Sequence, residues 1–327
     1  MNILVTIPVN EEHMKKLRAA APEAEFTIVP QSELTEASVN CKDIIIGNIP
    51  HELVKKADSL KWLQLNTAGA DGYAAVMPEG VPLTITSGAF GLAISEHMLG
   101  MMLMLMKRLH QYRDNQAKAY WHDEGSVKSV EDATVLTIGL GDIGGEFARK
   151  CKMLGAYTIG VRRTIHDKPD YIDELYSRES IEELLPRADV IALAVPSGET
   201  TFKLINEHTL SLMKEGAIIL NVGRGNAVDT DALADAVESG RVLCGLDVTD
   251  PEPLPKEHRL WHMENALITP HISGFFHLKQ TLDRIVDISA KNLKLFLSGE
   301  NLMNMVDYNT GYRSYERRVQ FDESQSV

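Results

Sequence analysis

Short apolar runs alternate with amphipathic stretches along the chain. The first apolar run, residues 3–6, precedes a helical pattern over residues 11–20. The later runs of strand type are residues 26–29, 43–46, 62–65, 83–86, 135–138, 157–161, 190–195, 217–222, 243–248 and 267–269. Helical or turn-like segments lie between most of them. Alternation of strands and helices predicts parallel sheets that helices cover on both faces.

Two long helical patterns stand apart from this alternation, one over residues 92–112 and one over residues 278–297. The first is rich in methionine, which fills irregular contacts, so we interpret it as a buried interdomain helix or a dimer contact. A shorter helix is predicted over residues 229–238. Asp229 is a good residue to cap its start, and Gly240 is a good residue just past its end.

A glycine-rich sequence, GLGDIG, follows the apolar run 135–138 directly and opens a helical pattern. In this fingerprint Gly139 makes the tight turn, Gly141 lets the backbone approach a pyrophosphate, and Gly144 lets the helix pack closely on the strand. The free N–H groups of the helix N-terminus favour an anion. The candidate cofactor residues here are Gly139, Gly141, Asp142, Ile143 and Gly144. The alternative is a tight strand-to-helix turn in an unrelated α/β protein.

Two α/β blocks are visible, and the second contains the fingerprint between the two long helices. The simplest organisation is a Rossmann dinucleotide-binding domain inserted into a flavodoxin-like α/β substrate domain. We place the dinucleotide-binding domain at residues 99–275. The substrate domain then consists of residues 1–98 and 276–327.

The net charge of −13, from 33 basic and 46 acidic residues, argues against nucleic acid or an anionic membrane as partner.

The cysteines Cys41, Cys151 and Cys244 form no C-x-x-C pair. They therefore predict reduced thiols, with neither a disulfide framework nor a metal site. The N-terminus lacks a signal-peptide pattern, and the longest apolar run, residues 98–106, is too short to span a bilayer. We expect a cytoplasmic protein.

The apolar run 157–161 ends at Arg162, Arg163 and Thr164. Rossmann proteins that bind NAD carry an acidic residue there, about 20 residues past the fingerprint, for the ribose 2′-hydroxyl. A guanidinium cannot accept a hydrogen bond from the ribose, but it can pair with a 2′-phosphate. These three residues are therefore candidate cofactor residues, and Arg162 favours NADP(H) over NAD. The alternative is a pair of solvated arginines at a strand end.

Three further motifs follow in order: NVGRG at residues 221–225, LDVTDPEPLP at 246–255 and TPHISG at 269–274. Together with GLGDIG they resemble the D-isomer-specific 2-hydroxyacid dehydrogenases, which include glyoxylate/hydroxypyruvate reductases and phosphoglycerate dehydrogenases. The resemblance extends over about residues 61–307. It implies reversible hydride transfer between NAD(P) and a small 2-oxo acid, such as glyoxylate or hydroxypyruvate, with a D-2-hydroxy acid as the reduced form.

The resemblance implies three catalytic residues, Arg224, Glu252 and His271. Arg224 offers a donor fork for the substrate carboxylate and the neighbouring carbonyl oxygen. His271 is of a type that can give a proton to the carbonyl oxygen and take it back in the reverse reaction. Glu252 would pair with the imidazole and fix its tautomer. Taken singly, each of the three residues has an ordinary structural alternative, as a turn, loop or solvated side chain.

Further residues are implied by the resemblance as ligand-binding. Ala68 and Gly69 would bind the substrate carboxylate through their backbone N–H groups, together with Arg224 and His271; a plain turn after residues 62–65 is the alternative. The additional cofactor-binding residues would be Pro196, Thr201, Val222, Gly223, Asp247, Ser273 and Gly274. A homodimer that acts on a small molecule, without nucleic acid or membrane as partner, is expected.

Phe275 and Phe276 depart from the family pattern, in which many members have a small residue or threonine there. They could shape the pocket for the substrate side chain, or they could begin the buried helix, which we favour. A different function class stays open, namely a non-catalytic, nucleotide-sensing binding protein on the same fold. Formate oxidation is disfavoured because that branch of the family has a non-acidic residue at the position of Glu252.

Overall fold

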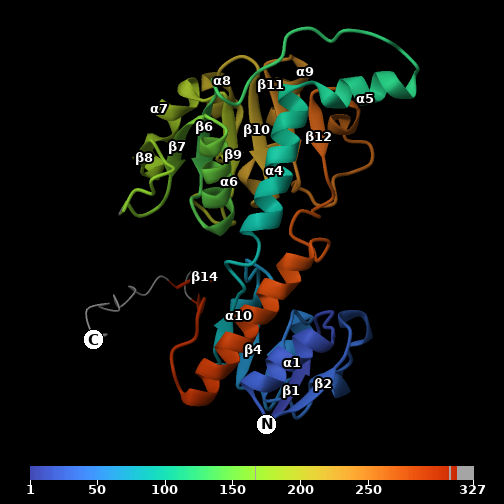
Figure 1. The fold of residues 1–327 in the computed structure, drawn as a ribbon, viewed down its shortest axis with the longest axis vertical. Coiled ribbons are helices and arrows are strands. Elements are labelled where there is room, and N and C mark those ends of the chain that lie inside the picture. Colours follow the sequence, from blue (N-terminus) through green and yellow to red (C-terminus); the bar gives the residue numbers. More distant parts are fainter. Residues whose placement is uncertain (166, 309–310, 315–327) are drawn as a thin grey trace. The chain divides into compact units, whose positions relative to one another are not determined.

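The computed structural model describes residues 1–165, 167–308 and 311–314. The chain forms two compact units (Figure 1). Unit 1 consists of Met1–Ala89 and Lys279–Val327, and unit 2 of Phe90–Leu278. The chain thus passes between the units at 89/90 and 278/279, where the sequence analysis placed the divisions at 98/99 and 275/276.

Unit 1 is built on a sheet of five parallel strands in the order β2-β1-β3-β4-β5. Its strands are β1 (Asn2–Val5), β2 (Glu25–Ile28), β3 (Ile44–Ile46), β4 (Trp62–Gln64) and β5 (Leu83–Thr84). Its helices are α1 (Glu11–Ala20), η1 (Gln31–Glu33), α2 (Glu36–Val39), α3 (His51–Val54), η2 (Tyr73–Ala75) and α10 (Lys279–Ser298), and β13 (Val306–Asp307) pairs with β14 (Tyr312–Arg313). This strand order is the flavodoxin-like one, so the predicted fold of the substrate domain is confirmed.

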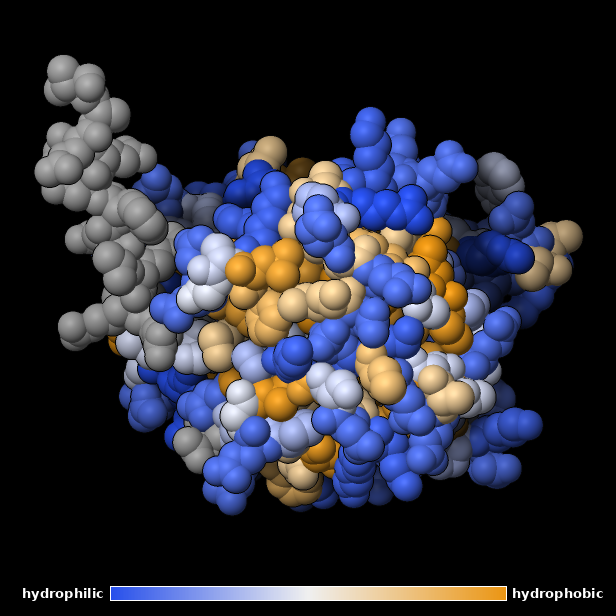
Figure 2. Space-filling model, turned by 90° about the horizontal axis from the view of Figure 1, so that it is seen from below, coloured by the Kyte–Doolittle hydropathy of each residue, from blue (hydrophilic) through white to orange (hydrophobic). Residues whose placement is uncertain are grey.

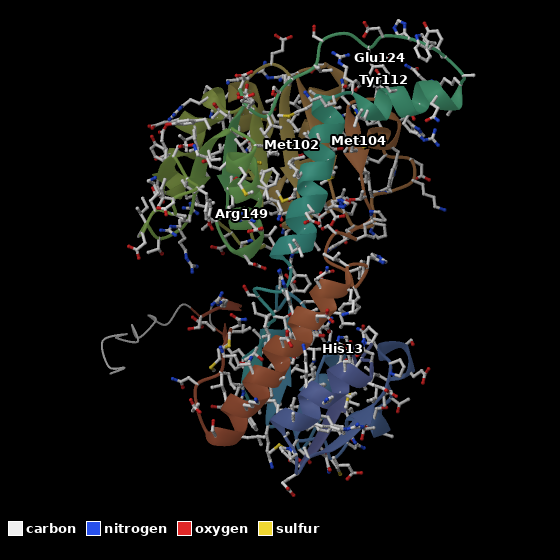
Figure 3. All side chains as sticks on the ribbon, viewed as in Figure 1. His13, Met102, Met104, Tyr112, Glu124 and Arg149 are labelled. Atoms are coloured by element: carbon white, nitrogen blue, oxygen red, sulfur yellow. The ribbon has the colours of Figure 1, made fainter. Side chains whose placement is uncertain are left out.

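Helices α1 and α10 of unit 1 pack on each other although they lie at opposite ends of the sequence. Asn10 caps α1 by accepting a hydrogen bond from the His13 N–H at 2.9 Å. The buried His13 ring (Figure 3) contacts Asp283 of α10, with 2.8 Å between Nε2 and Oδ1. His13 and Lys279 lower the pKa of Asp283 by hydrogen bonding to its carboxylate. Polar contacts therefore tie the returning segment of the chain to the first one.

Unit 2 is built on seven parallel strands in the order β12-β11-β10-β9-β6-β7-β8. The strands are β6 (Thr134–Ile138), β7 (Tyr157–Val161), β8 (Glu174–Tyr176), β9 (Val190–Leu193), β10 (Ala217–Asn221), β11 (Val242–Leu246) and β12 (Ala266–Ile268). The helices are α4 (Gly91–Met106), α5 (Leu109–Ala117), α6 (Asp142–Met153), η3 (Arg178–Ser180), α7 (Ile181–Leu184), η4 (Leu185–Arg187), α8 (Glu207–Leu212), η5 (Gly225–Ala227), α9 (Thr230–Glu238) and η6 (Arg259–His262). Chain order reverses at β6, which confirms the predicted Rossmann topology.

The prediction of one helix over residues 92–112 is wrong. Arg108 adopts a left-handed φ of 55°, and this residue separates α4 from α5. The methionines at one face of α4 are buried within unit 2, among them Met98, Met101 and Met102 (Figure 3). Gly245 of β11 leaves room for this face, because a Cβ there would lie 3.2 Å from the Met101 side chain. The methionine-rich face is thus part of the core of unit 2.

Two other features differ from the sequence analysis. Strand β8 was not predicted, because its residues are half-buried and form no apolar run. Phe275 and Phe276 do not begin a helix, which corrects the interpretation that we favoured. They lie in a turn before Lys279, the first residue of α10, and Phe275 is 52% exposed.

An ionic network joins α6 to α4. The Glu146 carboxylate accepts hydrogen bonds from Arg149 (Figure 3) and Lys150, and Lys150 Nζ donates to Ser95 Oγ of α4 at 2.7 Å. The hydrogen bond from Arg149, followed by that from Lys150, lowers the pKa of Glu146 to about 2. The carboxylate stays charged at neutral pH and holds the fingerprint helix against α4.

The surface seen in Figure 2 has hydrophilic side chains around its margin and apolar side chains grouped between them. Exposure of some apolar side chains between polar ones is ordinary for a folded protein. Among the helices that the structure describes, none combines the length and the apolar composition that a bilayer crossing requires.

Candidate active site

The glycine fingerprint forms the turn between β6 and α6. Gly139 has a φ of +97°, and a Cβ there would lie 2.5 Å from the Ala194 carbonyl oxygen. A Cβ at Gly144 would lie 2.0 Å from the carbonyl oxygen of Gly139, so the helix packs directly on the turn. A Cβ at Gly141 would meet nothing within 4 Å. The protein's own packing therefore explains the first and third glycines, whereas a ligand would explain the second.

Asp142, the first residue of α6, directs its carboxylate at the start of α4. Its Oδ2 accepts hydrogen bonds from the N–H groups of Gly91, at 2.8 Å, and Phe90, at 3.2 Å. Gly91 is required there, because a Cβ would lie 2.5 Å from Asp142 Oδ1. The groups that α6 can offer to an anion are thus the backbone N–H groups of its first turn, at Asp142 and Ile143.

The candidate 2′-phosphate residues lie where β7 ends. Arg162 is half-buried, whereas Arg163 and Thr164 are exposed. Arg162 Nη2 donates to the Asp167 carbonyl oxygen at 3.0 Å, and its buried Nε has no hydrogen-bond partner among the described residues. The guanidinium is therefore oriented by the backbone while part of its donor capacity is unused.

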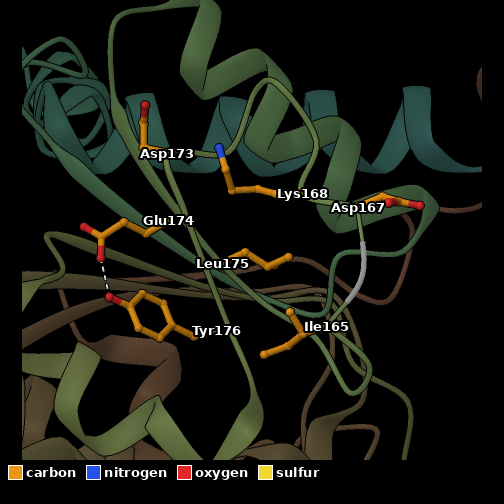
Figure 4. A pocket seen from close by; sticks show the side chains of 7 residues that line it. All are labelled: Ile165, Asp167, Lys168, Asp173, Glu174, Leu175 and Tyr176. Carbon is orange, nitrogen blue, oxygen red and sulfur yellow. Dashed lines mark hydrogen bonds between the residues drawn. The ribbon is translucent and has the colours of Figure 1, made fainter.

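A shallow pocket of about 430 Å³ lies next to this strand end (Figure 4). It is lined by Ile165, Asp167, Lys168, Asp173, Glu174, Leu175 and Tyr176. Arg162 contacts two of these residues, because its side chain donates to the Asp167 carbonyl and its N–H to the Tyr176 carbonyl. Neither Glu252 nor His271 contributes to the lining, so this pocket is separate from the predicted catalytic residues.

The loops after β9 and β10 approach each other closely. A Cβ at Gly223 would lie 2.4 Å from the Val195 carbonyl oxygen, and Val222 is buried beside it. In the loop after β9, Thr201 Oγ1 donates to the carbonyl oxygen of Pro196 at 2.7 Å. These predicted cofactor residues thus lie at the carboxyl ends of adjacent strands, where ligands bind in open α/β sheets.

Arg224 follows β10 and is half-buried. Its Nη1 donates to the Gly223 carbonyl oxygen at 2.7 Å. The buried side chain of Asn221 holds this turn, because its amide donates to the Arg224 carbonyl at 3.0 Å and accepts from the Gly223 N–H at 3.1 Å. Asn221 was not predicted as a site residue, although it is the first residue of the NVGRG motif.

Glu252 and His271 are paired, with 2.6 Å between Oε1 and Nδ1. Their side chains are 42% and 50% exposed, so the pair is open to solvent. A carboxylate at Nδ1 favours the tautomer with its proton there and leaves Nε2 for exchange with a ligand. His271 has a left-handed φ of 52°, a conformation that the surrounding structure must hold in place.

Asp247 is 2% exposed, and within the described part of the chain the hydrogen bonds that its carboxylate accepts come from residues 269–273. The donors are Thr269 Oγ1 at 2.6 Å, the Ile272 N–H at 3.0 Å, the Ser273 N–H at 3.1 Å and the Ser273 hydroxyl. Gly274 follows, where a Cβ would lie 3.3 Å from the Ile94 side chain. Asp247 therefore anchors the segment that contains His271.

The loop with Ala68 and Gly69 follows β4 in unit 1. Asn48 and Asn66 brace the start of this loop, because each side-chain oxygen accepts the other residue's N–H, at 2.6 and 3.0 Å. Within the described part of the chain, no acceptor is found for the N–H groups of Ala68 and Gly69. The two groups are thus available as donors for an anion.

A family model described as the NAD-binding domain of D-isomer-specific 2-hydroxyacid dehydrogenases matches residues 99–273, which is more than half of the chain. The chain belongs to the D-isomer-specific 2-hydroxyacid dehydrogenase family. The resemblance inferred from the four motifs is thereby confirmed, and the chain is placed among NAD(P)-dependent oxidoreductases of 2-hydroxy acids.

Relatives in this family match over nearly all of the chain. The glyoxylate reductase of Korarchaeum cryptofilum is 27% identical over 310 residues, covering 91% of each protein. The D-3-phosphoglycerate dehydrogenase of Methanocaldococcus jannaschii is 29% identical over 318 residues, which cover 94% of this chain but 59% of that enzyme. A crystal structure of a family protein from Aeromonas salmonicida has a TM-score of 0.83 at 29% identity, covering 94% of this chain and 99% of that one.

Two variants of the fingerprint separate packing from ligand binding in this family member. Gly144→Ala places a methyl group against the Gly139 carbonyl, and overpacking of this kind costs about 3 kcal/mol of stability. Gly141→Ala fits an open position with an ordinary φ of −81°, and its loss as an N-cap costs less than about 1 kcal/mol. We expect calorimetry to show a large fall in melting temperature for the first variant only.

Gly141→Ala is expected to weaken NADPH binding in a fluorescence titration, because its methyl group occupies the space open to the pyrophosphate. A Gly141→Ala protein that binds NADPH as tightly as the unmodified chain would contradict a ligand role for this position.

Proposed function

We propose that the chain reduces small 2-oxo acids of the glyoxylate and hydroxypyruvate type to D-2-hydroxy acids, reversibly, with NADPH as preferred cofactor. The observation that supports this most directly is the 2.6 Å pair of Glu252 and His271. It lies at the same edge of the sheet as Arg224, because all three follow the carboxyl ends of neighbouring strands. A general acid and a carboxylate-binding cation are the two groups that reduction of a 2-oxo acid requires.

The fingerprint fits a dinucleotide, since its open position at Gly141 and the first-turn N–H groups of α6 suit a pyrophosphate. When bound, a nicotinamide cofactor supplies the hydride for the carbonyl carbon of the substrate. Arg224 binds the carboxylate and the carbonyl oxygen of the 2-oxo acid through its donor fork. The N–H groups of Ala68 and Gly69 are assigned to the carboxylate as well.

His271 completes the reaction by proton transfer. Its Nε2 gives a proton to the carbonyl oxygen as the carbon–oxygen double bond becomes a single bond, and it takes the proton back in the reverse direction. Glu252 contacts Nδ1, which orients the ring and fixes the proton on that nitrogen. General acid catalysis of this kind contributes about 10²- to 10⁴-fold to the rate.

The preference for NADPH rests on Arg162. It stands at the end of β7, where a carboxylate would bind a ribose 2′-hydroxyl. Its guanidinium is held by the Asp167 carbonyl and has a buried Nε without a partner among the described residues. Such a group pairs with a 2′-phosphate by charge-assisted hydrogen bonds. Arg163 and Thr164 are assigned to the same phosphate, and activity with NAD is secondary.

Initial rates test the proposed activity. Oxidation of NADPH and NADH would be followed by absorbance with glyoxylate, hydroxypyruvate, pyruvate and phenylpyruvate. We expect the highest kcat/KM with glyoxylate or hydroxypyruvate and NADPH. Tight NADPH binding without turnover of any of the four acids would instead support the alternative function, a non-catalytic nucleotide-sensing protein.

Arg162→Asp tests the cofactor preference. We expect the KM for NADPH to rise about 10- to 100-fold, because a charge-assisted contact with the 2′-phosphate is lost, while the KM for NADH changes less. Arg18→Asp, the same charge change at an exposed residue of α1, is the matched control and should leave both KM values unchanged. Equal effects of Arg162→Asp on the two cofactors would contradict the assignment.

We propose that the chain forms a homodimer through residues 109–127, which follow α4. Met98, Met101 and Met102 of α4 are buried within unit 2, so we place the proposed contact on the residues that follow α4 and not on these methionines. The apolar side chains left exposed nearby are Leu109, Tyr120, Trp121 and Val127, and Trp121 is fully exposed. A second copy of the chain would bury them. A cytoplasmic location stays a prediction from the sequence.

Light scattering measures the mass in solution and so tests whether residues 109–127 form a dimer contact. We expect the unmodified chain to have twice the mass of one chain, and Trp121→Glu to shift the protein toward monomer because a charge would be buried in the contact. Glu264→Gln, at a charged position away from this segment, serves as control. A monomeric unmodified chain would contradict the homodimer.

A further inference from the structure

His97 lies on α4, outside the four sequence motifs, and none of the predicted roles includes it. Its Nε2 lies 3.0 Å from Thr269 Oγ1. Thr269 Oγ1 in turn lies 2.6 Å from Asp247 Oδ1. Three polar side chains from α4, from the end of β12 and from the end of β11 thus form a continuous chain of hydrogen bonds.

The direction of these hydrogen bonds follows from the chemistry of the groups. A buried carboxylate can only accept, so the Thr269 hydroxyl donates its proton to Asp247. The hydroxyl oxygen then has only its lone pairs for His97. His97 Nε2 must therefore carry a proton and donate it to Thr269. The imidazole fixes the rotation of the Thr269 hydroxyl toward the carboxylate.

Asp247 needs every one of its donors, because its side chain is only 1% exposed and a buried carboxylate is costly without hydrogen bonds. Within the described part of the chain, the close donors to its carboxylate belong to residues 269–273, the segment in which His271 lies. The Asp247 backbone carbonyl also accepts the His271 N–H at 2.8 Å. The aspartate therefore holds the segment on both sides of His271.

His271 depends on this anchoring more than an ordinary loop residue does. Its left-handed φ of 52° is unfavourable for a residue with a Cβ and persists only where neighbouring contacts impose it. Its imidazole is half exposed, so packing alone does not fix the ring. A small displacement of a catalytic group costs up to about 100-fold in rate.

We propose that His97 is a positioning residue that acts through the Thr269 hydroxyl and the Asp247 carboxylate to hold His271 in its left-handed conformation. This inference rests on the proposed function for its effect on turnover. The proposal gives α4 a role besides packing, because His97 fixes one end of the hydrogen-bond chain. At the other end, the Asp247 backbone carbonyl accepts the His271 N–H.

Two pairs of variants test the proposal. Thr269→Val removes the hydroxyl at nearly constant volume, and Thr269→Ser keeps it. His97→Leu removes the donor, and His97→Gln keeps an N–H donor on a side chain of similar length. We expect Thr269→Val and His97→Leu each to lower kcat about 10- to 100-fold with the KM for NADPH changed less than about twofold. The serine and glutamine variants should retain most of the activity.

The double variant distinguishes a shared path from two separate effects. Residues that act through one chain of contacts are non-additive, so His97→Leu with Thr269→Val should be little worse than either single change. Fully additive losses, or equal damage by Thr269→Ser and Thr269→Val, would overturn the proposal. Retention of full kcat by both donor-deleting variants would overturn it as well.

A measurement that does not need turnover keeps this inference apart from the proposed function. Hydrogen exchange of residues 269–275, followed by mass spectrometry, reports on the Ile272 and Ser273 N–H groups that Asp247 accepts. We expect faster exchange in His97→Leu than in His97→Gln, with similar melting temperatures. Unchanged exchange in His97→Leu would contradict the positioning role even if no 2-oxo acid is reduced by the unmodified chain.

Discussion

The ends of the parallel strands in unit 2 approach one another so closely that three positions have no room for a side chain. A Cβ at Gly139 would lie 2.5 Å from the Ala194 carbonyl, one at Gly223 would lie 2.4 Å from the Val195 carbonyl, and one at Gly225 would lie 1.9 Å from the Thr249 carbonyl. Contacts this short are impossible for a real Cβ, so glycine is the residue that permits the approach. These contacts fix the fingerprint turn after β6 and the turn that contains Arg224 after β10.

For Glu252 and His271, the proposed catalytic pair, orientation matters more than a contribution to stability. Glu252 and His271 are each about half exposed, and solvated ion pairs contribute only about 0–1 kcal/mol to folding. Asp247, in contrast, is buried and fully engaged with the segment that contains His271. The buried hydrogen bonds of Asp247 thus hold the backbone around His271, whereas the His271 side chain stays accessible.

The sequence predicts the fold well where burial dominates. Strands β9 and β10 are buried throughout, and β6 is buried after its first residue, so each appears as a largely apolar run. Strand β8 is half-buried and polar, so no apolar pattern marks it. The break at Arg108 depends on a single left-handed residue, and arginine gives no local signal for such a φ.

The candidate site was predicted to the extent that its residues lie in contiguous motifs. The fingerprint and the segments around Arg224, Glu252 and His271 are of this kind. The partners of those motifs are distant in sequence and were not foreseen. Asp142 caps α4 at Gly91, and His97 contacts Thr269, because helix packing and not chain neighbourhood brings them together. Long-range pairs of this type are visible only in the folded chain.

The proposed role of His271 as proton donor can be tested with the variant His271→Ala. The measurement is kcat for NADPH-dependent reduction of glyoxylate and hydroxypyruvate, beside the Kd for NADPH from fluorescence titration. We expect kcat to fall about 10²- to 10⁴-fold while the Kd for NADPH stays unchanged. A variant that binds NADPH and retains kcat within about threefold of the unmodified chain would contradict it.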